Sequence, residues 1–256
     1  MAHYQIILAY DGTQFAGYQR LDSNGCANHN RTVQSEIEKV LCDLGWTGNS
    51  ILSAGRTDQG VHASGQVITF DLEWKHSSQE LCQALNAKLP KDIAAQSVQI
   101  VPEKFHPRYT AKARCYRYQI YCQENRNPLM DRYAWRVWPA VNDDLLNKVA
   151  SLMIGKHDFR AFGKPPRQNG STERTIWQAN WEHSYQSPGL DRLWFEIIGD
   201  AFLYHMVRHL VFTQVQIGQG KLAMSELVDA LDNGILRISG LAPANGLILT
   251  KVIYDD

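Results

Sequence analysis

The stretch Ala54-Gly55-Arg56-Thr57-Asp58-Gln59-Gly60-Val61-His62 lies between two apolar runs of the chain. Ile51-Leu52 precedes it, and the run from Gly65 to Asp71 follows it. Short apolar runs bounded by glycine and polar residues are typical of strands. The sequence therefore predicts a tight loop that joins two strands, and the rest of the chain can be arranged around this loop.

One carboxylate, Asp58, lies in this loop between Gly55 and Gly60. Glycine accepts positive φ and lets another backbone come close. Arg56 is two residues from Asp58, so both side chains would leave the same face of an extended backbone. A nearby cation lowers the pKa of a carboxyl group, which makes Asp58 a candidate for an ionised nucleophile. The alternative is an Asx-turn, in which Asp58 only caps its own loop.

The first part of the chain alternates strands and helices. Tyr4–Tyr10 reads as a strand, and Thr32 is a suitable N-cap for an amphipathic helix that ends at Gly45. After the loop and its following strand, Ser77-x-x-Glu80 forms a capping box for a second helix, and Val98–Val101 reads as another strand. The order strand, helix, strand, strand, helix, strand is that of a ferredoxin-like domain.

The second part repeats this alternation less regularly. The patterns predict five strands and three helices. The strands are Cys115–Tyr121, Tyr133–Trp138, Thr175–His183, Leu193–Ile198 and Leu247–Tyr254, and the helices are Asn142–Gly155, Leu203–Val211 and Ser225–Leu231. Residues 159–174 read as a long basic loop. We therefore expect an α+β protein of two halves, residues 1–104 and 105–256.

The charge of the chain is unevenly distributed. Its 256 residues carry no net charge, yet residues 104–174 hold 14 Lys and Arg against six Asp and Glu. Such a basic stripe suits phosphate binding, although a solvated face would have the same composition. Aromatic residues occur within the stripe, where rings can stack on bases, and core packing is the alternative for each. The interleaved residues are Arg108, Tyr109, Lys112, Arg114, Tyr116, Arg117 and Tyr118.

Other classes of protein find little support. There is no signal-peptide pattern, no apolar run of membrane-spanning length and no nucleotide-binding glycine motif. The five cysteines form no C-x-x-C pair, which predicts reduced thiols and a cytoplasmic protein. His205 and His209 have the spacing of a zinc pair, but Arg208 lies between them and the catalytic Glu is missing. Cys115 has no histidine nearby in the sequence.

Together the motifs resemble those of the tRNA pseudouridine synthase A family. The most specific is Ala54-Gly55-Arg56-Thr57-Asp58-x-Gly60-Val61-His62 with Gly65-Gln66-Val67. Four others follow the order of the family: Tyr10-Asp11-Gly12-Thr13-x-Phe15-x-Gly17 with Gln19, Thr32-Val33-Gln34, Phe105-His106-Pro107-Arg108 through Tyr116-Arg117-Tyr118, and Ala201-Phe202-Leu203-x-His205-Met206-Val207-Arg208. These matches cover essentially the whole chain.

The resemblance implies the pseudouridine synthase fold, with two ferredoxin-like halves forming a continuous antiparallel sheet, helices on one side and a central cleft. It implies a homodimer that acts on tRNA without a cofactor or metal, isomerising uridines 38, 39 and 40 of the anticodon stem-loop. Asp58 would be the nucleophile. Arg56 would fill the space left by the flipped nucleotide, Tyr116 would stack on the base, and Arg208 would pair with Asp58.

Several positions depart from the family pattern: Tyr18 stands for the usual Trp, Leu21 for a Gln, Phe212 for a Gly and Asn245 for an acidic residue or Pro, and segment 21–30 is longer than expected. They bear on tRNA binding and not on Asp58.

Two rival functions are also compatible with parts of the sequence. The first is a non-catalytic RNA-binding protein, but such a protein would have no use for Asp58 near RNA, because a carboxylate repels phosphate. A glycosidase-like hydrolase needs a second carboxylate as its acid.

Overall fold

The computed structural model describes residues 1–20, 31–165, 167, 169–184, 191–237 and 240–255. Contacts within the chain divide it into two compact units. Unit 1 consists of Met1–Lys112 and Ile248–Asp256, and unit 2 consists of Ala113–Leu247. Both are mixtures of helices and mostly antiparallel strands, so the predicted α+β class is confirmed. The expected surface excursion at residues 21–30 lies outside the described residues.

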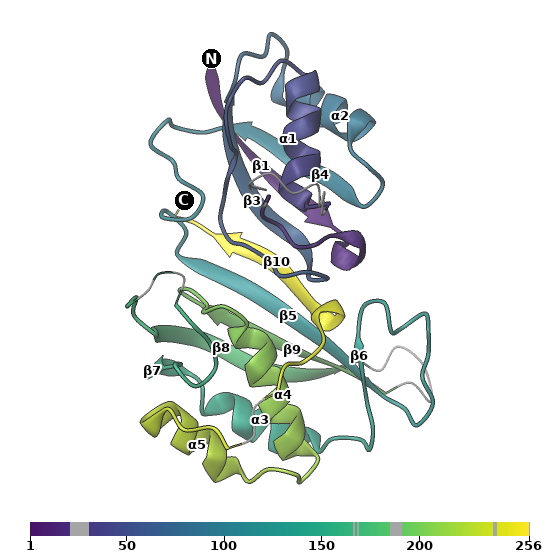
Figure 1. Ribbon diagram of the computed structural model, residues 1–256, viewed down its shortest axis with the longest axis vertical. Coiled ribbons are helices and arrows are strands. Elements are labelled where there is room, and N and C mark those ends of the chain that lie inside the picture. Colours follow the sequence, from purple (N-terminus) through teal and green to yellow (C-terminus); the bar gives the residue numbers. More distant parts are fainter. Residues whose placement is uncertain (21–30, 166, 168, 185–190, 238–239, 256) are drawn as a thin grey trace, which may run out of the picture. The chain divides into compact units, whose positions relative to one another are not determined.

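Unit 1 has the strand order of the predicted ferredoxin-like domain. Its strands are β1 (Ala2–Tyr10), β2 (Leu52–Ser53), β3 (His62–Leu72) and β4 (Ile93–Ile100). They lie in the order β4-β1-β3-β2, and every neighbouring pair is antiparallel. β2 is only two residues long because the chain leaves the sheet at Ala54 to form the Asp58 loop. Figure 1 shows β1, β3 and β4 beneath the helices of this unit.

The helices of unit 1 begin where their capping residues predict. α1 (Val33–Asp43) has Thr32 as its N-cap, whose hydroxyl accepts a hydrogen bond from the Ser35 amide. α2 (Ser78–Lys88) begins with the predicted capping box of Ser77 and Glu80. Such caps satisfy amide groups that the first helical turn leaves unbonded. The two helices contact each other, and α2 packs along β4.

The last strand, β10 (Leu247–Ile253), pairs with β3 in unit 1. Ile248 lies opposite His62 in a parallel pairing that begins where the Asp58 loop ends. A Cβ on Gly65 would lie 2.2 Å from the Thr250 carbonyl oxygen, so only glycine permits this close approach. We expected this strand with the C-terminal half, because its apolar pattern identifies a strand but not the strand it pairs with.

Unit 2 contains a second antiparallel arrangement in the order β5-β9-β8-β7, and β6 pairs parallel to β5. The strands are β5 (Ala113–Cys122), β6 (Trp135–Val137), β7 (Gly155–Asp158), β8 (Glu173–Ser184) and β9 (Asp191–Gly199). The sequence did not predict β7, whose four residues Gly-Lys-His-Asp show neither an apolar run nor β-branched side chains. The predicted loop, residues 159–174, follows β7, but its last two residues belong to β8, and residues 166 and 168 lie outside the described residues.

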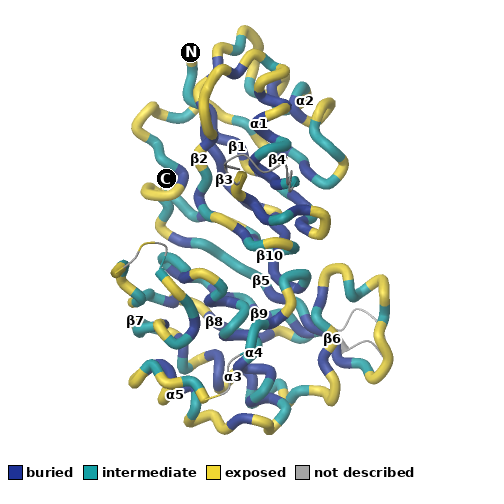
Figure 2. The backbone as a smooth tube through the Cα atoms, in the orientation of Figure 1, coloured by how far each residue is buried: buried dark blue, intermediate teal, exposed yellow. Residues whose placement is uncertain are grey.

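Three helices complete unit 2: α3 (Asp143–Ser151), α4 (Met206–Gly218) and α5 (Met224–Asn233). The sequence pattern placed Leu203 in the first turn of α4. The structure begins that helix three residues later, because His205 has φ of +65° and cannot continue a right-handed helix. Figure 2 shows buried residues along the strands and within the helices of each unit, and exposed residues mainly in the connecting segments.

Candidate active site

The Asp58 loop occupies residues 54–61, between β2 and β3 as predicted. The Ala54 amide donates to the Val67 carbonyl at 2.9 Å, and the Val61 amide donates to the Asp58 carbonyl at 3.1 Å. Gly60, in the turn, has φ of +79°, a value that glycine adopts without strain. Asp58 is half-buried and Arg56 is exposed. The loop therefore presents Asp58 at the surface of unit 1 on a backbone tied down at both ends.

Buried polar side chains of unit 1 hold the loop by hydrogen bonds. The Tyr10 hydroxyl is 2.8 Å from the Thr57 hydroxyl, in a site closed to solvent. The Gln66 amide nitrogen donates to the Gly55 carbonyl at 2.9 Å. Burial raises the pKa of Tyr10 to about 12, although hydrogen bonds with Thr57 and Gln66 oppose the rise. The phenol is therefore a neutral hydrogen-bonding group at physiological pH.

A segment after β1 also holds the loop. The Tyr18 amide donates to the Thr57 carbonyl at 3.0 Å, and the Gln34 amide of α1 donates to the Tyr18 carbonyl at 2.9 Å. Tyr18 is 2% exposed, so this residue belongs to the core of unit 1. Glu38 of α1, also buried, accepts from the Ile51 amide at 3.1 Å. α1 is thus linked by hydrogen bonds to Tyr18, whose amide holds the loop at Thr57, and to Ile51, which comes before the loop.

Gly12 and His62 form a further close contact beside the loop. The Gly12 amide donates to Nδ1 of His62 at 3.0 Å, and an oxygen of Asp11 lies 3.2 Å from the same nitrogen. Gly12 begins η1 (Gly12–Gln14), a short 3-10 turn. A Cβ at Gly12 would lie 2.0 Å from the carbonyl oxygen of Val61. This contact explains why the Asp-Gly pair after β1 belongs with the Asp58 loop.

In unit 2, Tyr116 and Tyr118 lie on β5 and have different environments. Tyr116 is half-buried, and its ring meets Phe202 edge-on with 5.1 Å between the centroids. Tyr118 is fully buried and its hydroxyl donates to the Pro243 carbonyl at 2.7 Å. Of the two rings that share this face of the strand, Tyr118 is thus a core residue. The stacking role predicted for Tyr116 stays a prediction.

Arg208 lies in the first turn of α4 and is half-buried. Its Nε donates to the Ala242 carbonyl at 2.7 Å, and the Ala242 amide donates to the Arg208 carbonyl at 3.3 Å. Burial raises the pKa of Tyr118 well above its usual value, and the charge of Arg208 opposes that rise. The guanidinium is therefore held in one place by the segment that precedes η2 (Ala244–Gly246).

His205 and His209 lie close together as their spacing suggested, with 6.2 Å between the ring centroids, although only His209 is part of α4. His205 precedes α4 in the left-handed region, and its ring stacks on Tyr204 at 3.6 Å between centroids. Nδ1 of His209 lies 2.8 Å from the Gly240 carbonyl. Among the described residues, no group of three or more His, Cys, Asp or Glu is arranged to hold a metal. None of the described helices is both long and apolar enough to span a membrane.

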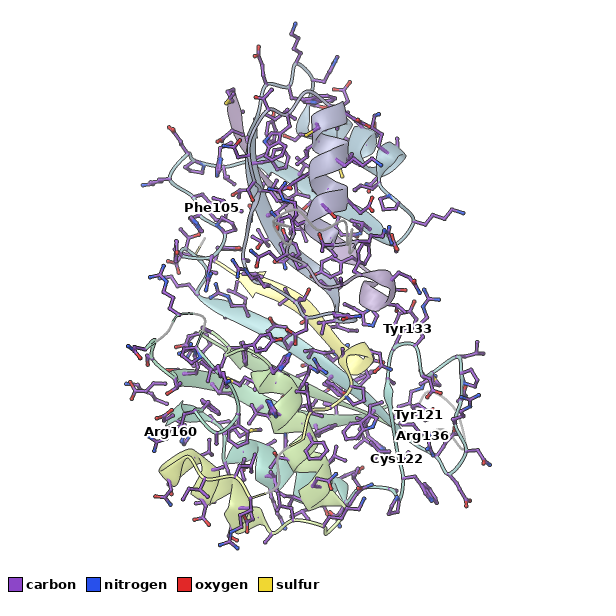
Figure 3. All side chains as sticks on the ribbon, viewed as in Figure 1. Phe105, Tyr121, Cys122, Tyr133, Arg136 and Arg160 are labelled. Atoms are coloured by element: carbon purple, nitrogen blue, oxygen red, sulfur yellow. The ribbon has the colours of Figure 1, made fainter. Side chains whose placement is uncertain are left out.

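Part of the basic stripe is engaged in contacts within unit 2. Arg117 forms an ion pair with Glu196 and lies over the Trp194 ring at 4.8 Å, so it is less suited to phosphate than the sequence suggested. Arg114 donates to the Asp200 carbonyl at 2.8 Å. Arg136 and Arg160 lie on opposite sides of this unit (Figure 3). The stripe in sequence is therefore not one continuous row of cations in space.

Tyr10, Thr57 and Gln66 support the Asp58 loop, a role that the local sequence pattern does not predict. A signal was present for Gln66, which is a polar residue inside the otherwise apolar run that becomes β3. Polar side chains that are fully buried need hydrogen-bond partners, so such a residue predicts a specific contact. Its partner, the Gly55 carbonyl, is brought into reach by the pairing of β2 with β3, and the sequence does not give that register.

Comparison with known proteins identifies the chain. A family model described as tRNA pseudouridine synthase matches residues 6–110 and 149–255. A "tRNA pseudouridine synthase A" of Geobacillus kaustophilus is 39% identical over 253 residues, which cover 98% of this chain and 93% of the relative. Proteins of the same name from Exiguobacterium sp. and Streptococcus equi subsp. equi are 35% and 36% identical over 256 and 258 residues. They cover 100% of this chain and 99% and 100% of the relatives.

A solved structure of an unknown protein from Galdieria sulphuraria matches 86% of this chain and 94% of its own, at 12% identity and a TM-score of 0.23. That likeness is too low to inform the fold or the function. The family match and the curated relatives are sufficient without it. The chain belongs to the tRNA pseudouridine synthase family and is an isomerase that forms pseudouridine from uridine in tRNA.

Proposed function

We propose that this enzyme modifies uridines 38, 39 and 40 in the anticodon stem-loop of tRNA, with Asp58 as its nucleophile. The observation that carries the proposal is the Asp58 loop, in which a half-buried carboxylate stands on a backbone anchored to buried polar residues of unit 1. A structural Asx-turn needs no such support, since it forms from its own backbone. A nucleophile does, because attack requires accurate placement of the reacting atoms.

The chemistry follows from the isomerisation itself. The N1–C1′ bond of uridine breaks, the detached base turns, and a C5–C1′ bond forms while the C5 proton leaves and N1 takes up a proton. Asp58 is proposed to start the reaction by forming a covalent bond to the target nucleotide. This bond breaks again later in the reaction, so that the carboxylate is regenerated. A base in a stem must leave the stack before a carboxylate reaches it. Neither an oxidant nor a nucleotide cofactor enters this balance.

Three further residues have proposed roles in that step. Arg56, exposed beside Asp58, takes the space that the flipped nucleotide leaves. Tyr116 stacks on the base, and Phe202 fixes the orientation of its ring. Arg208 pairs with Asp58 and places a positive charge beside the nucleophile. We also propose that the enzyme acts in the cytoplasm as a homodimer, as the family resemblance implies.

Mapping of the product tests the proposed target. A tRNA transcript with uridine at positions 38, 39 and 40 is incubated with the enzyme, and pseudouridines are located by chemical labelling and primer extension. We expect stops at these positions and none in transcripts where each uridine is replaced by cytidine. Pseudouridine found only in another arm of the tRNA would contradict the proposed target while leaving the tRNA activity intact.

Arg208→Met is expected to lower turnover by about 100-fold, because removal of a preorganised charge typically has an effect of this size. tRNA affinity should change by less than about threefold, since a single cation contributes little to the whole protein–tRNA interface. Single-turnover rates and filter binding measure the two quantities. Arg208→Lys should recover part of the rate, and Arg237→Met, which removes an exposed arginine paired with Glu226, is the control. An unchanged rate in Arg208→Met would assign Arg208 to a structural contact only.

Binding of tRNA should weaken steeply with salt despite the zero net charge, because Lys and Arg release counterions from phosphates. Arg126, exposed between β5 and β6, is expected to be one of these cations. Arg126→Gln should reduce the slope of log affinity against log salt by about one. Arg117→Gln should leave the slope unchanged, since Arg117 is already paired with Glu196. If the tRNA affinity of the native enzyme did not depend on salt, the basic stripe would not be a phosphate-binding surface.

A further inference from the structure

We infer that Tyr10 is a positioning residue for this reaction, and that its buried hydrogen bond with Thr57 sets the place from which the Asp58 carboxylate attacks. The inference rests on the proposed role of Asp58. Tyr10 is not a catalytic residue in this account, since it lies beneath the loop and acts through Thr57. Gln66 contributes to the same support through the Gly55 carbonyl.

Thr57 directly precedes Asp58 in the loop. Its side chain is 7% exposed although both of its neighbours in the loop are more accessible, and its hydroxyl is 2.8 Å from that of Tyr10. Tyr10, at the end of β1, is 4% exposed. A buried hydroxyl is costly unless it is hydrogen-bonded. Each of these two groups therefore holds the other in place.

Several independent hydrogen bonds hold the part of the loop that precedes Asp58. The Thr57 carbonyl accepts from the Tyr18 amide at 3.0 Å, and the Gly55 carbonyl accepts from Gln66 at 2.9 Å. These donors come from parts of the chain before α1 and from β3. Three bonds from separate segments thus fix Thr57 and Gly55, two of the three residues that precede Asp58. A displacement of about 1 Å at a reacting group lowers a rate by about 100-fold, so supports of this kind matter to turnover.

Tyr10 stays protonated throughout the pH range of the reaction. Burial raises its pKa to about 12, partly offset by hydrogen bonds with Thr57 and Gln66. The phenol therefore keeps its proton below pH 10, and the hydrogen bond does not change over the range in which turnover is measured. Tyr10→Phe should accordingly lower the rate without moving the pH profile. A general acid or base at this position would instead shift a limb of that profile.

A matched control lies in the same unit. Thr69, in β3, is fully buried, and its hydroxyl has no hydrogen-bond partner among the described residues. Thr57→Val and Thr69→Val make the same chemical change in two buried threonines of unit 1, only one of which supports the loop. Any loss that comes from replacing a buried threonine in general will appear in both variants.

The experiment measures single-turnover pseudouridine formation at saturating enzyme, tRNA affinity and thermal unfolding for each variant. We expect Thr57→Val and Tyr10→Phe to lower the single-turnover rate by about 10- to 100-fold with tRNA affinity within about twofold. Thr57→Ser, which keeps the hydroxyl, should restore most of the rate lost in Thr57→Val. The double variant Tyr10→Phe/Thr57→Val should be no slower than the slower single variant, because both substitutions remove the same Tyr10–Thr57 bond. Thr69→Val should keep the native rate.

Rates of Thr57→Val and Tyr10→Phe within about twofold of native, at a temperature where all variants are folded, would overturn the inference. Additive losses in the double variant would overturn it as well, since they would show two separate effects. Failure of the proposed function has a different signature. In that case Asp58→Asn turns over normally, whereas an inactive Asp58→Asn with a native Thr57→Val would reject the positioning role alone.

Discussion

Replacing Asp58 with Asn is expected to abolish release of tritium from tRNA labelled at C5 of uridine. The amide has nearly the shape of the carboxylate, so the loop should keep its hydrogen bonds to Val61 and Tyr18. It has no negative charge and is a poor nucleophile, so the step that detaches the base cannot begin. Since enzymes accelerate reactions by at least about 10⁶-fold, we expect a fall of at least about four orders of magnitude.

Binding should be preserved in this variant, or even strengthened, because a carboxylate near RNA repels phosphate. Asp71→Asn is the matched control. Asp71 lies on β3 of the same unit, where it contacts His3 at 2.6 Å and is largely exposed. Its turnover should stay within about twofold of native, as expected for a surface substitution outside the site. Native-level turnover by Asp58→Asn would exclude Asp58 from the mechanism and leave the nucleophile unassigned.

Features that depend on neighbouring residues in the chain could be predicted from the sequence. The caps at Thr32 and Ser77 were correct, because a capping side chain bonds amides only two or three residues away. The loop at Asp58 was correct for a similar reason, since the apolar runs on either side of it determine where strands end. The resemblance to a family rested on these same local motifs and was confirmed by the comparisons.

Features that depend on pairing across the chain could not be predicted. The apolar pattern of β10 identifies a strand, yet its pairing with β3 depends on the close approach at Gly65. Arg117 was expected to face phosphate, but its ion pair with Glu196 follows from the register of β5 and β9, which sets these residues opposite each other. The support of Thr57 by Tyr10 likewise exists only after β1 and β3 have paired.

Gly12→Ala is expected to destabilise the protein strongly, because buried Gly12 leaves no room for a Cβ. The added Cβ would lie 2.0 Å from the Val61 carbonyl oxygen and 2.6 Å from its carbon, and neither is the end of a flexible side chain. The backbone of η1 or of the Asp58 loop must therefore move. Forced shifts in a packed site cost about 1–3 kcal/mol and occasionally more, and we expect a value near about 3 kcal/mol here.

For a chain of this length that loss corresponds to a fall in Tm of about 6–12 °C, which calorimetry measures directly. Turnover at 25 °C should also fall, because Gly12 bonds His62 and contacts the residue that closes the Asp58 turn. Gly55→Ala is the matched control for stability: a Cβ there meets nothing within 4 Å, and Gly55 lacks a positive φ. Its Tm should change by less than about 2 °C, which corresponds to the usual effect of a surface substitution. Equal Tm values for the two variants would mean that η1 can move away from the loop without cost, and that the Asp-Gly pair is not part of the support on which the position of Asp58 depends.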